Sequence, residues 1–240
     1  MKIENSVTLV TGASRGIGRA LVSALVSAGA KRVYAAARKP AALADLVAAH
    51  PDRVVAIELD VTDPRQVDAL AATTADVSLL VNNAGSLTAY GLLDGPRDTL
   101  ERELATNFYG MLNVTKAMLP QLEKSHGSIV NVLTVVSLAS MPALGGYSAS
   151  KAAAFSATQA LRHELRKKGV AVHAVFPGPV DTEMSKDITL PKTSPNDVAR
   201  AIVEGIARGD EDILPDPMAR QVWEGWTKDP KAVERQFGAM

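Results

Sequence analysis

Hydrophobic residues gather along the chain in short β-branched runs that alternate with longer stretches of helical spacing. The short runs are nearly continuous in apolar residues, which is typical of strands in a parallel sheet with helices on both faces. This alternation predicts right-handed crossovers and an α/β fold with a doubly wound parallel sheet. The expected strands are 7–10, 32–37, 54–59, 78–81, 128–133 and 170–176, and the expected helices are 17–28, 40–49, 64–74, 97–125 and 147–168.

No linker, low-complexity stretch or repeat divides the 240 residues. We therefore expect a single domain over residues 1–240. In doubly wound sheets, ligands bind at the carboxyl ends of the strands, near the point where the strand order reverses. Candidate functional residues are accordingly sought in the segments that directly follow a strand.

The composition removes several classes of partner. The 26 Lys and Arg residues balance 26 Asp and Glu residues, so no basic surplus favours nucleic acid. The chain has no Cys, and its four His are scattered without metal-ligand spacing, so we expect neither disulfides nor a metal site. No apolar run approaches the roughly 20 residues of a membrane span, and the polar start MKIENSVTLVTG is unlike a signal peptide. We expect no membrane partner and a cytoplasmic location.

A glycine-rich turn, TGASRGIG, follows the first expected strand and precedes a helix. Gly12, Gly16 and Gly18 allow the backbone to turn tightly and to approach a ligand where a Cβ atom would collide. The helix that begins here presents unpaired N–H groups and a partial positive charge, which suit a pyrophosphate. Such a turn can also simply relieve crowding between strand and helix. Its place after the first strand favours dinucleotide binding.

The end of the second expected strand indicates which dinucleotide is bound. An acidic residue there would bind the ribose 2′-hydroxyl of NAD, but this chain has alanines at 35–37, followed by Arg38 and Lys39. Arg15 lies in the glycine turn. Two guanidinium groups without a nearby acid suit a 2′-phosphate through charge-assisted hydrogen bonds, and so favour NADP(H). The alternative is that both arginines are merely exposed to solvent.

The segment YSASK places Tyr147 and Lys151 four positions apart, on one face of an expected helix. An ammonium close to a phenol favours the phenolate, so the pair suits proton transfer to or from a substrate. The alternative is that Tyr147 is an ordinary residue of an amphipathic helix, because Y-x-x-x-K also recurs by chance.

Six motifs follow one another along the chain: TGASRGIG, LDVTD, NNAG, TNFYG, YSASK and FPGPVDT. Together and in this order they resemble the motifs of the short-chain dehydrogenase/reductase family. The resemblance implies a Rossmann-type fold, and a homodimer or homotetramer built on the long helices 97–125 and 147–168. It also implies cofactor contacts from Gly12, Ser14, Arg15, Gly16, Ile17, Gly18, Arg38, Asp60, Val61, Asn83, Ala84, Gly85, Tyr147, Lys151, Pro177, Gly178, Val180 and Thr182.

The resemblance further implies a catalytic set of Tyr147, Lys151, Asn107 and one hydroxyl residue. In the family that hydroxyl belongs to a Ser thirteen residues before the Tyr, and here position 134 is Thr. Thr keeps the hydroxyl but adds a methyl group and stiffens χ1. We expect Thr134 to fill this role, with Ser137 as the next candidate. Asn107 would anchor a water that links Lys151 to solvent, although a buried Asn can also simply bridge two strands.

Together these features predict an NADP(H)-dependent oxidoreductase that interconverts a carbonyl and an alcohol by hydride transfer, with Tyr147 as acid and base. A non-catalytic dinucleotide-binding regulator or scaffold is one alternative, and an epimerase or dehydratase of the same fold is another. Pocket walls are expected near 86–95, 135–146 and 180–192. Because these segments are mostly apolar, we expect a neutral, apolar ketone, aldehyde or secondary alcohol as the substrate.

Two tryptophans, Trp223 and Trp226, stand three positions apart on one face of an expected C-terminal helix. We expect them to cover an edge of the core. Subunit contact and closure of the substrate pocket are the alternatives.

Overall fold

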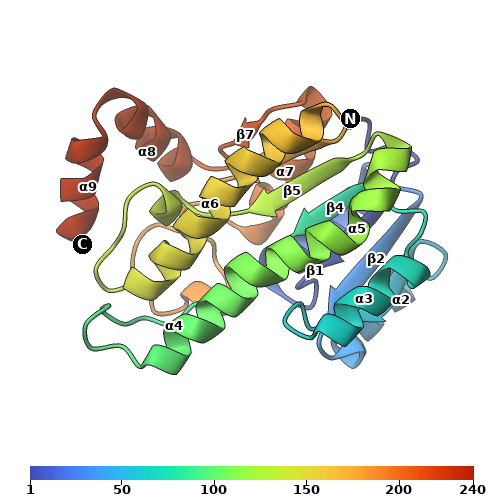
Figure 1. The fold of residues 1–240 in the computed structure, drawn as a ribbon, viewed down its shortest axis with the longest axis horizontal. Helices are drawn as coiled ribbons and strands as arrows, with labels where there is room; N and C mark the ends of the chain where they lie inside the picture. The colour runs from blue at the N-terminus through green and yellow to red at the C-terminus, as the bar shows by residue number, and fades with distance from the viewer.

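The computed structural model describes residues 1–240 and contains a seven-stranded parallel sheet, drawn in Figure 1. The strand order is β3-β2-β1-β4-β5-β6-β7, so it reverses between β1 and β4. This order confirms the predicted doubly wound α/β architecture. The strands are β1 (Val7–Thr11), β2 (Arg32–Ala37), β3 (Val54–Glu58), β4 (Leu79–Asn82), β5 (Ser128–Val132), β6 (Ala171–Val175) and β7 (Asp212–Ile213).

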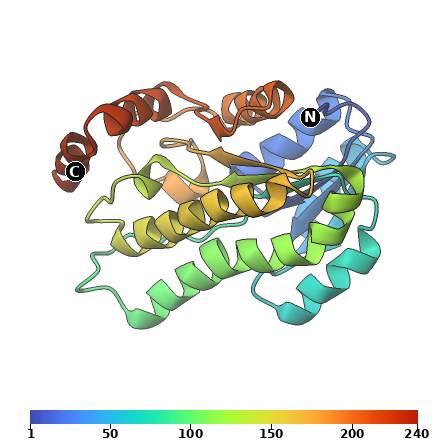
Figure 2. The same cartoon turned by 45° about the horizontal axis from the view of Figure 1, so that its top comes forward.

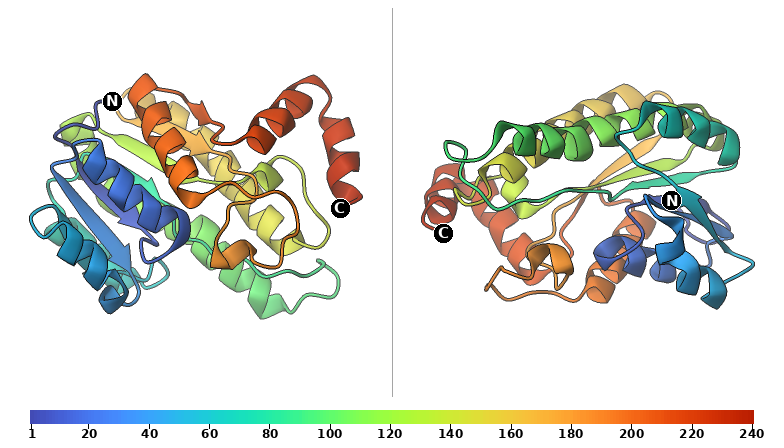
Figure 3. Two further views of the ribbon diagram at one scale, coloured as in Figure 1. Left: turned by 180° about the vertical axis from the view of Figure 1, so that it is seen from behind. Right: turned by 90° about the horizontal axis from the view of Figure 1, so that it is seen from below.

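Helices cover both faces of the sheet. Their bounds are α1 (Gly16–Ser27), α2 (Ala44–Ala49), α3 (Pro64–Thr73), α4 (Arg97–Leu104), α5 (Met111–Ser125), α6 (Gly145–Arg166), α7 (Pro195–Arg208), α8 (Pro217–Lys228) and α9 (Pro230–Gly238). Figures 2 and 3 show α5 and α6 on one face, and α1 and α7 on the other. Helices α3, α7, α8 and α9 each begin with a proline, and the Asp or Ser before it accepts a backbone N–H of the first turn. These caps define where the four helices start.

Two apolar clusters fill the spaces between the sheet and the helices. The cluster on the α1 and α7 face includes Leu21, Leu25 and Ile202, which have no exposed surface. The cluster on the α5 and α6 face includes Leu80 and Met118, which are equally buried. Full burial of each such side chain contributes about 1.5–3 kcal/mol. The packed core therefore holds the carboxyl ends of the strands in place, and the predicted site residues lie directly beyond these ends.

The expected helix over 97–125 is present but is not uniform. Helix α4 continues through a π-helical turn, Ala105–Gly110, into α5. A π turn departs from the regular hydrogen-bond ladder of an α-helix and frequently marks a functional site. Asn107, one of the predicted catalytic residues, lies in this turn.

The sequence pattern does not predict β7, α7 or the division of the C-terminal segment into α8 and α9. The two tryptophans of α8 cover a core edge as expected: Trp223 packs on Phe176 and Trp226 on Phe155, with ring centroids 5.1 and 6.5 Å apart. None of the helices combines the length and the apolar content needed to traverse a lipid bilayer.

Candidate active site

The glycine turn joins β1 to α1, and its shape depends on the absence of side chains. Gly12 and Gly16 have φ angles of +65° and +56°. A Cβ atom on Gly12 would lie 2.8 Å from the Cα atom of Ala84, and one on Gly18 would lie 2.3 Å from the carbonyl oxygen of Gly12. No side chain caps the N-terminus of α1, so the N–H groups of its first turn remain available to an anion. The turn therefore fits a pyrophosphate.

Asn83 and Thr11 fasten this turn to the end of β4. The Nδ2 atom of Asn83 donates to the carbonyl oxygens of Thr11 and Gly12, at 2.9 and 3.1 Å. The hydroxyl oxygen of Thr11 accepts from the backbone N–H groups of Asn83 and Ala84, both at 3.0 Å. The side chain of Asn83 thus holds the turn, and a cofactor contact in this segment would come from the backbone of Ala84 and Gly85.

The residues predicted to meet the adenosine half of the cofactor lie beyond β1, β2 and β3. Arg15 and Arg38 are exposed, and neither guanidinium forms a hydrogen bond or an ion pair within the chain, although the charge of Glu183 lies near Arg15. The carboxylate of Asp60 accepts from the hydroxyl and the backbone N–H of Thr62, at 2.7 and 2.9 Å. Val61 is buried. Both guanidinium groups are consequently available to a phosphate.

The segment that follows β6 returns to the glycine turn. The Cγ2 atom of Thr182 lies 3.0 Å from the Cβ position of Gly16, so the two segments touch. The backbone N–H of Gly178 donates to Oδ2 of Asp216 at 2.9 Å, which ties this segment to the start of α8. Val180 is buried in the core on the α1 and α7 face. The predicted contact segment therefore lies against the glycine turn, although the side chain of Val180 points into the core.

Tyr147 and Lys151 lie on successive turns of α6, and only 9% and 5% of their surfaces are exposed. The Nζ atom of Lys151 donates to the carbonyl oxygen of Val132, at the end of β5, at 2.8 Å. It lies 5.9 Å from the centroid of the Tyr147 ring and 3.7 Å from the Cβ position of Gly85. The ammonium therefore sits between the ends of β4 and β5, with two further N–H groups available to a ligand.

Burial dominates the proton affinities of this pair. It raises the pKa of the Tyr147 phenol above its usual range, and the negative charge of Glu103 raises it further. Burial lowers the pKa of the Lys151 ammonium to about 8. Lys151 was expected to lower the pKa of Tyr147, but burial and the charge of Glu103 raise it instead, because a buried phenolate is costly. The chain's own groups thus keep the phenol protonated at neutral pH.

Asn107 uses its side chain to hold the segments around the tyrosine. Its Nδ2 atom donates to the carbonyl oxygen of Ser86 and to the hydroxyl of Ser150, both at 2.8 Å. Its Oδ1 atom accepts the backbone N–H of Ser86 at 2.8 Å. Ser150 in turn donates to the carbonyl oxygen of Tyr147 at 2.8 Å. Both N–H groups of Asn107 are therefore used, and a water would have to bind at Oδ1.

Thr134 lies two residues beyond β5 and is buried. Its Oγ1 atom accepts the backbone N–H of Val136 at 3.4 Å, a long hydrogen bond that caps a short 3₁₀ turn. Its hydroxyl proton has no partner within the chain and is available to a ligand. The hydroxyl of Ser137 is also buried without a partner. Both candidate hydroxyls thus lie in the turn that packs beside α6.

Apolar side chains from two of the expected pocket segments surround Tyr147. Leu144 belongs to the same buried cluster as the tyrosine, and Leu87, Leu138 and Met141 pack against that cluster. The Lys151 ammonium, 5.9 Å from the ring centroid, donates to the carbonyl oxygen of Val132. Segments 86–95 and 135–146 therefore form an apolar surrounding for the phenol.

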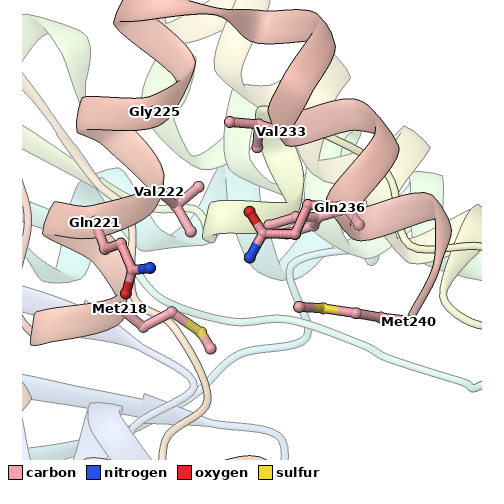
Figure 4. A pocket seen from close by; sticks show the side chains of 8 residues that line it. Met218, Gln221, Val222, Gly225, Val233, Gln236 and Met240 are labelled. Carbon is pink, nitrogen blue, oxygen red and sulfur yellow. The ribbon is translucent and has the colours of Figure 1, made fainter.

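The hairpin of α8 and α9 forms a third wall that the sequence analysis did not predict. It adds Val222, Val233 and Phe237 to the cluster around Tyr147. A cavity of about 210 Å³ lies between the two helices and is lined by these three side chains and by Met218, Gln221, Gly225, Gln236 and Met240. Figure 4 shows this pocket from close by. None of the residues predicted to act on substrate or cofactor lines this cavity.

Three residues that shape the site were not singled out by the sequence analysis. Thr11 is the first residue of TGASRGIG, and Ser150 stands inside YSASK, so both lay within quoted motifs. Glu103 is fully buried but stands in the charged run LEREL. A charged residue in such a run is usually solvated, so no local signal distinguishes this buried carboxylate.

Comparison with known proteins agrees with this geometry. Residues 6–193 match the family model described as short chain dehydrogenase. A short chain dehydrogenase from Burkholderia cenocepacia, solved in complex with NADP, is 36% identical and has a TM-score of 0.93 over 99% of both chains. A short chain dehydrogenase/reductase from Burkholderia phymatum, solved in complex with NAD, is 25% identical, with a TM-score of 0.87 over 97% of this chain and 96% of its own. A 3-oxoacyl-[acyl-carrier-protein] reductase from Synechocystis is 35% identical over 190 residues, which are 76% of this chain and 77% of its own.

The fold and the glycine turn, taken with these relatives, define an oxidoreductase that binds a nicotinamide dinucleotide. The chain belongs to the short-chain dehydrogenase/reductase family. The relatives include both an NADP complex and an NAD complex, so membership alone leaves the choice between the two cofactors open.

Proposed function

We propose that the chain is an NADP(H)-dependent oxidoreductase that interconverts a carbonyl and an alcohol by hydride transfer, with Tyr147 as acid and base. The observation that carries this proposal is the position of Lys151 between the ends of β4 and β5, one helical turn from a buried phenol. The glycine turn follows β1, the neighbour of β4 in the sheet. A dinucleotide seated on that turn would extend along the strand ends toward Tyr147.

The chain's own residues divide the chemistry between them. When bound, the nicotinamide supplies or accepts the hydride. In the reductive direction, Tyr147 donates its proton to the carbonyl oxygen, and the hydroxyl of Thr134 holds the same oxygen by a hydrogen bond. Lys151 keeps one N–H on Val132 and offers the others to the ribose hydroxyls. A water on Oδ1 of Asn107 connects Lys151 with solvent.

NADP(H) is the proposed cofactor because Arg15 and Arg38 carry unpaired guanidinium groups beside the expected adenosine site. Strand β2 ends in alanines, so no carboxylate stands where it would repel a 2′-phosphate. The relative from B. cenocepacia, solved with NADP, supports the same choice. A charge-assisted hydrogen bond contributes about 1.5–3 kcal/mol, which is enough to set the preference.

Arg38→Ala is expected to raise the KM for NADPH roughly tenfold or more, because one charge-assisted bond to the 2′-phosphate is lost. NADH lacks that phosphate and serves as the internal control, so its KM should stay nearly unchanged. Steady-state kinetics with both cofactors measure the change, and Arg15→Ala is tested in parallel. A rise of equal size for NADPH and NADH would contradict the assignment.

Thr134→Ala is expected to lower kcat by roughly a hundredfold, the usual effect of removing one hydrogen-bond donor at a reacting oxygen. Thr134→Ser keeps the hydroxyl and removes only the methyl group, so its kcat should stay within about tenfold of the parent. Steady-state kinetics of the two variants measure the difference. An alanine variant as active as the parent would exclude Thr134 from catalysis and make Ser137→Ala the next variant to test.

A neutral, apolar ketone, aldehyde or secondary alcohol is the proposed substrate. Leu87, Leu138 and Met141 support this class, because these apolar side chains pack against the cluster that contains the phenol. We also propose a homodimer or homotetramer that uses the surface of α4, α5 and α6. The long helices α5 and α6 lie on the same face of the sheet, which agrees with this assembly.

The test begins with NADPH binding, measured by fluorescence, and continues with NADPH oxidation in the presence of a substrate panel. The panel contains neutral aryl ketones, 3-oxoacyl thioesters, which are suggested by the Synechocystis relative, and acidic keto compounds. The neutral ketones should react fastest. Binding without oxidation of any member would favour a non-catalytic binding protein. Conversion of a substrate without net NADPH consumption would favour an epimerase or dehydratase, and a preference for the acids would overturn the proposed substrate class.

A further inference from the structure

Glu103, on α4, is a buried carboxylate without a cationic partner. None of its surface is exposed, and it takes part in no ion pair of the chain. A buried charge is normally paired with an opposite one, because its transfer from water is otherwise costly. The environment of Glu103 must therefore supply hydrogen bonds that offset this cost.

Those hydrogen bonds come from the pocket loop 86–95. Oε1 of Glu103 accepts the backbone N–H of Thr88 at 2.7 Å, and Oε2 accepts the hydroxyl of Tyr90 at 2.8 Å. Burial and the neighbouring Glu103 raise the pKa of Tyr90 to about 12, so Tyr90 remains a donor. Both carboxylate oxygens thus face donors from one loop, and the loop is fixed at two points.

Two glycines form the slot through which Tyr90 reaches Glu103. A Cβ atom on Gly95 would lie 1.8 Å from the Tyr90 ring, and one on Gly146 would lie 1.9 Å from its hydroxyl oxygen. Neither position can carry a larger side chain while the Tyr90 ring lies between the two glycines. The backbone N–H of Gly145 also donates to the carbonyl oxygen of Tyr90 at 3.3 Å. The loop is therefore packed directly against the first turn of α6.

The same carboxylate lies at the N-terminus of the helix that carries the proposed acid. Leu144, the residue before α6, provides no side-chain cap. Oε2 of Glu103 is 2.7 Å from the Cβ position of Gly146, in the first turn. A negative charge at this end of a helix is favourable, because the backbone N–H groups there are unpaired. Glu103 therefore contacts both the pocket loop and the start of α6.

We propose that Glu103 is a positioning residue that fastens loop 86–95 to α6 and holds a negative charge at Gly146, the residue before Tyr147. This inference rests on the acid and base role proposed above for Tyr147. The charged and titratable groups around the pair are Tyr90 in the loop, Arg102 on α4, and Lys151 on α6. Glu103 opposes Lys151 in this setting, because its charge disfavours the phenolate that alcohol oxidation requires.

Two variants separate the electrostatic role of Glu103 from its role in holding loop 86–95 against α6. In Glu103→Gln the shape is kept, since the amide oxygen can accept from Thr88 and the amide N–H can donate to the hydroxyl of Tyr90. The pH profile of kcat/KM for alcohol oxidation should shift to lower pH, with a rate on its acid limb roughly threefold or more above the parent. Tyr90→Phe keeps the charge and loses one bond to the loop, so the substrate KM should rise while the pH profile stays in place.

Each result has a defined meaning. A pH profile for Glu103→Gln that overlays that of the parent overturns the electrostatic role of Glu103. An unchanged substrate KM in Tyr90→Phe overturns its role in holding the loop. Thermal unfolding shows whether Glu103→Gln folds, and Tyr90→Phe carries the test if it does not. Loss of turnover in Tyr147→Phe shows independently that the proposed function stands. If the parent turns over no substrate, ultraviolet titration of the Tyr147 phenol with NADP⁺ added replaces kinetics, and an unchanged midpoint in Glu103→Gln overturns the inference.

Discussion

Tyr147→Phe is expected to lower kcat by roughly 10²- to 10⁴-fold, the usual contribution of a positioned acid or base. The phenylalanine ring keeps its place in the cluster with Leu144 and Phe237. The hydroxyl makes no hydrogen bond within the chain, so its removal leaves no buried partner unpaired and folding should be intact. NADPH oxidation measures the loss, and NADPH fluorescence measures the retained binding.

Tyr109→Phe is the matched control for this substitution. Tyr109 is 56% exposed in the π turn and takes no part in the proposed chemistry. Its variant should retain the activity of the parent, which shows that loss of a tyrosine hydroxyl is not harmful in general. Full activity in Tyr147→Phe would refute the acid and base assignment and with it the proposed mechanism.

The fold was largely readable from the sequence because its core strands are buried on both faces. Such strands appear as uninterrupted apolar runs, and every end of the six expected strands lies within one residue of the observed end in β1 to β6. Strand β7 was not predicted, because it is only two residues long, Asp212 and Ile213, and is defined by its pairing with β6. The pattern of two residues carries no periodicity, so only tertiary contact defines this strand.

The site was readable where its parts are local in sequence. The glycine turn and the Tyr147–Lys151 pair each lie within one motif, and the structure brings both to the same edge of the sheet. The π turn at Asn107 was not readable, because it accompanies hydrogen bonds to Ser86 and Ser150, which are distant in sequence. Glu103 was missed for the same reason, since its burial depends on loop 86–95.

The direction of the pKa shift at Tyr147 could not be predicted from the sequence either. Spacing alone indicates that Lys151 is near the phenol, but the balance between attraction and desolvation depends on burial. Both groups are almost completely buried, and burial penalises the charged form of each. The free chain therefore holds a protonated phenol suited to reduction. A cationic, oxidised nicotinamide would supply the charge that favours the phenolate in the opposite direction.

Lys151→Met is expected to lower kcat/KM by roughly a hundredfold or more, because the charge that stabilises the reacting phenol is lost. The same change removes a buried ammonium whose pKa is depressed from 10.5 to about 8. That depression corresponds to about 3 kcal/mol of destabilisation below pH 8. The carbonyl oxygen of Val132 loses its donor, which opposes the gain by about 1–3 kcal/mol. The net change in stability at pH 7 should thus be small, although activity is lost.

The pH dependence of stability distinguishes these two contributions. Between pH 8 and 10.5 the unfolded parent binds more protons at Lys151 than the folded parent does, so the stability of the parent rises with pH. Lys151→Met lacks this titration, and the other ionisable groups contribute equally to both proteins. The difference in unfolding free energy should therefore move in favour of the parent across that interval. Denaturant unfolding at several pH values measures it, and a difference that stays constant would mean that burial does not depress the pKa of Lys151.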